Sequence, residues 1–193
     1  MSTKAGRDLD TLSSFELARA RPALATDLGR FTGASAIAEL MLLFSGGHAD
    51  PALYDALAAA LDGIAAAEPG RARDATLAAA WRLIAMLGFS PELTHCAECH
   101  AAISADGVAI FSHAAGGALC PACGRRSPAG RKLPPAARAA IVHWTAGGQT
   151  SPLAEDEERA HQRLLREFLL HHVTDGRPLR AFDLWEHATW NRA

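Results

Sequence analysis

The four cysteines of this 193-residue chain form two Cys-x-x-Cys pairs, Cys96 with Cys99 and Cys120 with Cys123, and twenty residues separate the pairs. Each Cys-x-x-Cys turn can direct two sulfurs and several backbone N–H groups at one ion, and two such turns complete a tetrahedral shell. The spacing therefore predicts a structural Zn²⁺ site with four thiolate ligands and no coordination position left open for catalysis.

Paired cysteines have two other common uses. Disulfides are typical of small secreted domains, but the chain begins Met1-Ser2-Thr3-Lys4, without a charged and then apolar leader. A thioredoxin-like redox site needs one Cys-x-x-Cys pair between a strand and a helix, not two distant pairs. His95, His100 and His113 could replace a sulfur, but four thiolates already fill the shell. Zinc with four sulfurs is the working hypothesis.

Composition favours a helical fold. Hydrophobic residues make up 49% of the chain and aromatic residues only 6%, and most of the apolar excess is alanine. No apolar run approaches the roughly 20 residues that cross a bilayer, and thiols suited to a metal indicate a reducing compartment. We predict a cytoplasmic, nucleoid-associated protein that is mainly α: a helical bundle with an inserted four-cysteine zinc-ribbon-like β-hairpin element.

Apolar residues recur at the three-and-four spacing of amphipathic helices along most of the chain. Asp50-Pro51 and Asp74 are expected to begin helices, Gly88 to end one, and Ser13 with Glu16 to form a capping box. The predicted helices lie near 13–20, 24–45, 51–67, 74–88, 134–147 and 151–172, with a last segment near 182–190 that either docks on the bundle or extends from it.

The segment between the cysteine pairs has a different character. Residues 107–111 are short, apolar and partly β-branched, and Gly116-Gly117 offers turn chemistry, so a β-hairpin over the metal is expected. We assign residues 94–127 as a zinc-binding insertion in a helical domain that spans 13–193. Residues 1–12 are expected to be the remnant of an N-terminal strand or disordered.

Charge is distributed unevenly, because residues 107–154 contain no Asp or Glu but carry Arg125, Arg126, Arg131, Lys132 and Arg138. Such a cluster attracts phosphates by releasing condensed counterions. We take Arg125, Arg126, Arg131 and Lys132 as candidate contacts to the DNA backbone, insensitive to base sequence because no aromatic residues are interleaved for stacking. The alternatives are a solvated surface, or arginines that neutralise the formal charge of −2 on a four-thiolate zinc centre.

These motifs together carry a family resemblance. The run 87–93, Leu-Gly-Phe-Ser-Pro-Glu-Leu, precedes the first cysteine pair, and Gly116-Gly117-Ala118-Leu119 leads into the second. With Phe111-Ser112 and the upstream segments 27–30 and 36–40, the pattern resembles the C-terminal helical, zinc-binding part of the bacterial DNA repair and recombination mediator family RecO. The likeness extends from about Leu9 to about Arg177.

The resemblance implies a non-catalytic mediator of DNA repair and homologous recombination. Such a protein binds single- and double-stranded DNA and acts with single-strand-binding protein and RecR to load RecA. Family members usually carry an N-terminal OB-fold, of which only residues 6–12 are expected to have a counterpart here. Their helical part receives the acidic, hydrophobic tail of single-strand-binding protein, which requires an apolar depression rimmed by Arg or Lys. Four candidates for the rim are interpreted as ordinary surface groups: Arg19, Arg21, Arg30 and Arg82.

No motif supports an enzyme. The chain has no phosphate-binding loop with Lys-Ser/Thr, no nucleophile elbow and no His-Glu-x-x-His pair. The alternative to a DNA-binding mediator is therefore a second non-catalytic class, a zinc-stabilised helical adaptor that binds only proteins.

Overall fold

The computed structural model describes residues 14, 16–17, 19–44, 50–150, 152–173 and 177–190, without the side chains of the last two. The segment 1–12, the capping box at Ser13 and the predicted helix end near 45–47 lie outside these residues. The described elements are α1 (Ala23–Thr26), α2 (Leu28–Phe44), α3 (Pro51–Ala66), α4 (Ala72–Met86), β1 (Ala109–Ser112), β2 (Gly117–Leu119), α5 (Pro121–Gly124), β3 (Arg131–Leu133), α6 (Pro135–Thr145), α7 (Glu155–His172) and α8 (Arg180–Trp190). The mainly helical prediction is confirmed.

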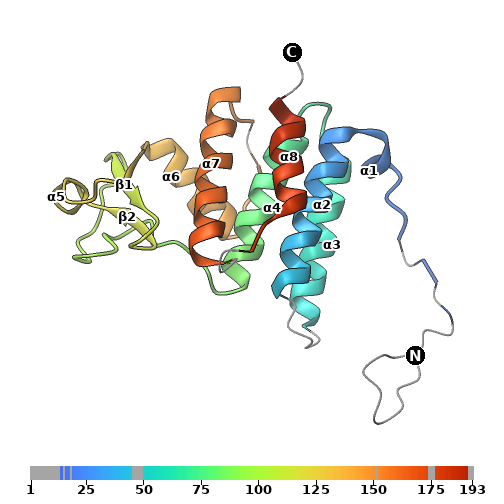
Figure 1. Ribbon diagram of the computed structural model, residues 1–193, viewed down its shortest axis with the longest axis horizontal. Coiled ribbons are helices and arrows are strands. Elements are labelled where there is room, and N and C mark those ends of the chain that lie inside the picture. The colour runs from blue at the N-terminus through green and yellow to red at the C-terminus, as the bar shows by residue number, and fades with distance from the viewer. Residues whose placement is uncertain are drawn as a thin grey trace, which may run out of the picture.

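Helix α4 lies in the middle of the helical body, between α2 and α3 on one side and α6 and α7 on the other (Figure 1). Its Trp81 is fully buried and contacts Phe168 of α7, with ring centroids 5.4 Å apart. The strands and α5 project from the end of the body that is far from α1 (Figure 1). Among the described helices, none combines the length and apolar character that a membrane span requires.

The predicted helix 24–45 is divided at Asp27 into α1 and α2, and the described residues within the predicted helix 13–20 are not helical. Other helix termini follow the sequence signals. The carboxylate of Asp50 accepts a hydrogen bond from the Leu53 amide at 3.1 Å, and Pro51 occupies the first turn of α3. Gly88 has φ of 89°, which ends α4 as predicted. Asp74 is a correction: α4 begins two residues earlier, so its buried carboxylate lies in the first turn and pairs with Arg71 at 3.3 Å.

The C-terminal helix docks on the bundle, which is one of the two arrangements expected from the sequence. Phe182 and Trp185 are buried. The carboxylate of Glu39 on α2 accepts hydrogen bonds from the amides of Ala181 and Phe182 at 2.9 and 3.1 Å. Because these amides belong to the first turn of α8, a side chain 142 residues away in sequence caps the helix.

The three strands form one antiparallel sheet in the order β2-β1-β3. The predicted hairpin of β1 and β2 is present, whereas β3 was not predicted. Alternate residues of β1 point to opposite faces. Phe111 packs toward the helical body, 6.2 Å from Phe168, while Ile110 and its cross-strand partner Leu119 pack against Cys96 and Cys123. The sheet therefore joins the cysteine segment, residues 94–127, to the helices.

Candidate metal centre and adjoining cavity

The four cysteine sulfurs converge. All four sulfurs lie within 4.8 Å of one another, and those of Cys99 and Cys120 are 3.8 Å apart. A tetrahedral ion with Zn–S bonds of about 2.3 Å would hold its sulfurs about 3.8 Å apart. A disulfide needs about 2.05 Å, and all four cysteines are free thiols. The arrangement fits one tetrahedral metal ion.

Two different local structures present the two pairs. A tight turn carries Cys96 and Cys99: the His100 amide donates to the Cys96 carbonyl at 2.9 Å, and His100 has a left-handed φ of 59°. Cys120 immediately precedes α5, whose first residue is proline, so one helical turn places Cys120 and Cys123 on the same side.

Backbone contacts fix one pair against the other. The Ala97 amide, inside the first pair, donates to the Ala118 carbonyl of β2 at 2.8 Å. The Ala118 amide in turn donates to the Glu92 carbonyl at 2.7 Å. A Cβ atom on Gly117 would lie 2.2 Å from that Glu92 carbonyl oxygen, so only glycine allows this approach.

The surroundings shift the pKa values of Cys96, Cys120 and Cys123 in different directions. Burial alone would raise the pKa of Cys96, but backbone amides, that of Cys99 foremost, lower it to about 6. The Cys123 amide lowers the pKa of Cys120, whereas burial and the neighbouring side chains raise that of Cys123. Four thiolates this close repel one another, and a divalent cation would allow all of them to stay deprotonated.

The nearby histidines stay outside the sulfur cluster, which among the described residues consists of the four cysteines alone. His95 and His100 are exposed. Nε2 of His113 lies 2.9 Å from the Glu167 carboxylate on α7. The ligand set available to a metal is therefore purely thiolate.

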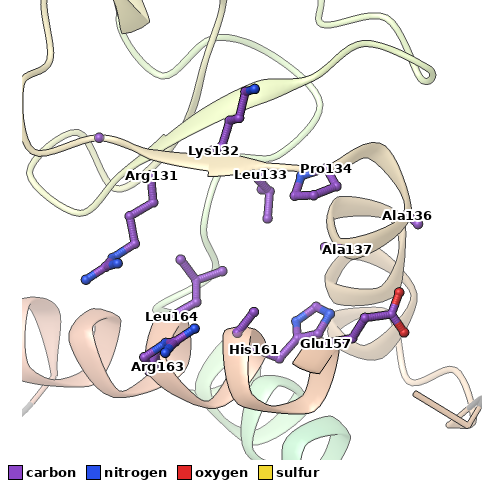
Figure 2. A pocket seen from close by; sticks show the side chains of 12 residues that line it. Arg131, Lys132, Leu133, Pro134, Ala136, Ala137, Glu157, His161, Arg163 and Leu164 are labelled. Carbon is purple, nitrogen blue, oxygen red and sulfur yellow. The ribbon is translucent and has the colours of Figure 1, made fainter. Parts of the chain in front are cut away.

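The predicted basic residues do not all point to the same side of the sheet. Arg125 and Arg126 are exposed at the end of α5, and Arg126 pairs with Glu98 at 3.3 Å. On β3, Arg131 points toward α7 and Lys132 points away from it on the opposite face of the strand (Figure 2). Within the described chain, neither Arg125 nor Lys132 takes part in an ion pair.

Arg138 is a correction to the predicted positive surface. Its side chain is buried, and its guanidinium donates to the carbonyl oxygens of Ser104 and Ala105. It thereby fixes the loop that precedes β1 to helix α6.

A cavity of about 460 Å³ lies between β3, α6 and α7 (Figure 2). Its lining includes the apolar side chains of Leu133, Ala137 and Leu164, and it also includes Arg131 and Arg163. Figure 2 shows the two arginines at the same end of the cavity. This cavity was not predicted from the sequence, because three segments that are apart in the chain line it.

His161 lines the same cavity and was also missed. The residue is buried, its ring meets that of Trp144 edge-on at 5.0 Å, and its Nδ1 has no hydrogen-bond partner among the described residues. Burial lowers the pKa of His161 to about 4, so the ring is neutral at pH 7.

Comparison with known proteins places most of the chain in one family. The family model "Recombination protein O C terminal" matches residues 25–181. The DNA repair protein RecO of Gloeobacter violaceus is 33% identical over 185 residues, which cover 94% of this chain and 69% of the relative. The RecO protein of Desulforudis audaxviator is 35% identical over 71% of this chain and 52% of the relative. The RecO protein of Symbiobacterium thermophilum is 36% identical over 61% of this chain and 47% of the relative. The chain thus spans about half to two thirds of these relatives.

Proposed function

The chain belongs to the RecO family of DNA repair proteins, and from this we propose that it is a non-catalytic mediator of DNA repair and homologous recombination. In this proposal it acts in the cytoplasm, at the nucleoid, with single-strand-binding protein and RecR to load RecA onto DNA. The observation that carries the proposal is the family match over residues 25–181, which contains both cysteine pairs and the helices that support them.

The metal in this proposal is one structural Zn²⁺ ion held by Cys96, Cys99, Cys120 and Cys123. Bound zinc would supply no reaction chemistry, because four thiolates leave it no open position. Its contribution is to join the first cysteine turn to α5, and thereby to fix α5 on the outer face of the sheet.

DNA contact is assigned to the basic residues on that outer face. Lys132 is the cross-strand partner of Ile110, so the two side chains share a face. A Cβ atom on Gly124 would lie 2.6 Å from Ile110, so α5, which Arg125 directly follows, packs on the same face. We propose Arg125 and Lys132 as the principal phosphate contacts. Arg126 and Arg131 contribute less, because Glu98 and Glu167 already neutralise them.

Titration with single-stranded DNA at several salt concentrations tests this assignment. Replacing Arg125 and Lys132 by alanine should weaken DNA binding. The slope of log K against log salt concentration should become shallower by an amount that corresponds to about two phosphate contacts. Arg159→Ala, which removes an α7 arginine paired with Glu155, is the matched control and should leave both quantities unchanged. Binding that the double variant leaves intact would contradict the assignment.

The tail of single-strand-binding protein is proposed to occupy the cavity of Figure 2. Leu133, Ala137 and Leu164 provide an apolar surface, and Arg163 provides positive charge at the end where Arg131 is already paired with Glu167. These features match an acidic peptide with apolar side chains, and the volume of about 460 Å³ is within the range of ligand pockets. The four arginines considered from sequence do not line this cavity.

Fluorescence anisotropy with a labelled acidic, hydrophobic peptide tests the cavity. Arg163→Ala should weaken binding by about tenfold, the usual effect of losing one charge-assisted contact, and Arg159→Ala should not. Peptide binding combined with no salt-sensitive DNA binding would favour the alternative function, a zinc-stabilised adaptor that binds only proteins. The cavity is the observation that favours this alternative.

A further inference from the structure

Arg126 contacts both cysteine pairs. Its Nη2 atom lies 3.4 Å from Cys123 Sγ, within hydrogen-bond distance for sulfur, and 3.3 Å from the Glu98 carboxylate. Cys123 belongs to the second pair, and Glu98 lies between the two cysteines of the first pair. One guanidinium group therefore bridges the turn that carries Cys96 and Cys99 to the helix that carries Cys120 and Cys123.

A contact of this kind affects how a metal is held. A four-thiolate Zn²⁺ centre has a formal charge of −2, and an N–H donor aimed at one sulfur disperses part of that charge. With zinc bound, the bridge would also keep Cys123 in place if its bond to the metal broke, which would favour rebinding over release. Cys123 itself is buried, so only groups in its immediate surroundings can act on its sulfur.

We propose that Arg126 is a positioning residue of the metal centre, which retains the ion by holding Cys123 and Glu98 together. This inference rests on the proposed zinc site and goes beyond it, since nothing in the four-cysteine pattern requires an arginine. The two adjacent arginines therefore have different roles: Arg126 holds the metal-binding segments together, and Arg125 is available to bind a partner.

Release of zinc to a colorimetric chelator from the fully loaded, reduced protein tests the proposal. Arg126→Ala should release zinc about tenfold faster than wild type, the lower end of the effect of groups that support metal ligands, because the arginine side chain is 71% exposed. Arg125→Ala, which changes the neighbouring arginine, should release zinc at the wild-type rate. Arg126→Lys keeps the charge but cannot reach both partners and should show an intermediate rate.

A second measurement separates an effect on the sulfur from general loosening. In protein loaded with Co²⁺, the thiolate-to-metal charge-transfer band reports electron density on sulfur, and it should shift in Arg126→Ala but not in Arg125→Ala. Wild-type release rates and an unshifted band in Arg126→Ala would overturn the inference while leaving the zinc site standing. Wild-type protein that binds no metal would instead refute the zinc site itself.

Discussion

Arg131 of β3 and Glu167 of α7 form a two-point ion pair: Nε of Arg131 donates to Oε2 at 2.6 Å, and Nη2 donates to Oε1. Nε2 of His113, at the end of β1, lies 2.9 Å from the same carboxylate. One side chain of α7 thus contacts β3 and the residue that follows β1, at the same end of the sheet. The orientation of the cysteine segment relative to the helices depends on this contact together with the packing of Phe111 on Phe168.

Replacing Glu167 by glutamine should loosen the sheet from α7 and lower the free energy of unfolding by about 1 kcal/mol, since the carboxylate is partly exposed. Faster amide hydrogen exchange in β1 and β3, with zinc retained, is the expected readout. Glu155→Gln on the same helix is the control, because its partner Arg159 lies on α7 itself. Unchanged exchange in the Glu167 variant would show that apolar packing alone fixes the sheet.

The Glu167 contact should also depend on pH. Burial alone would raise the pKa of Glu167, but Arg131 and His113 lower it below the ordinary value of 4.5. A carboxylate with a lowered pKa in the folded state stabilises the protein above the unfolded pKa, and this contribution is lost as the pH falls through the folded pKa. Acid unfolding below about pH 4.5 should therefore be shallower in Glu167→Gln than in wild type.

Two buried groups on α7 should make opposite contributions to stability between pH 4 and pH 7. Burial lowers the pKa of His161 from 6.5 to about 4, so its contribution is present above pH 6.5 and is lost as the pH falls toward 4. Burial and a hydrogen bond with Asp74 raise the pKa of Glu158 from 4.5 to about 7, so its contribution is present below pH 4.5 and is lost as the pH rises through 7.

Single substitutions should separate these two effects. In His161→Phe, which keeps Glu158, the free energy of unfolding measured with urea should rise as the pH falls from 7 to 4.5. In Glu158→Gln, which keeps His161, it should fall as the pH falls from 6.5 to 4. Each trend should amount to roughly 3 kcal/mol at most. Identical pH profiles for wild type and both variants would show that neither group changes its proton affinity on folding.

His100 offers a stabilising substitution. Its left-handed φ of 59° strains any residue with a Cβ atom, and its side chain is exposed. Glycine at this position should raise the free energy of unfolding by up to about 1 kcal/mol, after the greater entropy of glycine in the unfolded chain is subtracted. Thermal unfolding of His100→Gly and His100→Ala measures the change in stability of each variant. If alanine stabilised the protein as much as glycine does, relief of the left-handed backbone would not be the cause.

Loss of one sulfur should release the metal. Cys120→Ser should reduce zinc from one ion per chain to a small fraction, and exchange of the β1 and β2 amides should become faster. Helical circular dichroism should change little, because Trp81 belongs to the main core cluster, whereas Cys96 and Cys123 belong to a separate small cluster. His95→Ala, beside Cys96 but outside the sulfur cluster, should retain its zinc. A metal content that Cys120→Ser leaves unchanged would place the ion elsewhere.

Local signals in the sequence predicted the parts of the fold that depend on neighbouring residues. Asp50 followed by proline begins α3, and Gly88 ends α4, because capping and left-handed turns are decided within a few residues. The convergence of the cysteines was also predictable, since metal-ligand spacing constrains even distant segments.

Features that depend on distant contacts were not predictable. Strand β3 has three residues, two of them charged, and it exists only because β1 offers hydrogen bonds to it. Arg138 looked like a surface cation, yet two loop carbonyls account for its burial. Likewise, Arg126 and Arg131 have acidic partners at distances in the chain that no local pattern encodes.

X-ray absorption spectroscopy of freshly purified, reduced protein tests the four-sulfur zinc site, because it gives the identity, number and distance of the metal's ligands. We expect one zinc ion per chain with four sulfur ligands at about 2.3 Å and no nitrogen or oxygen ligand. Protein without bound metal, or zinc with fewer than four sulfurs, would contradict it.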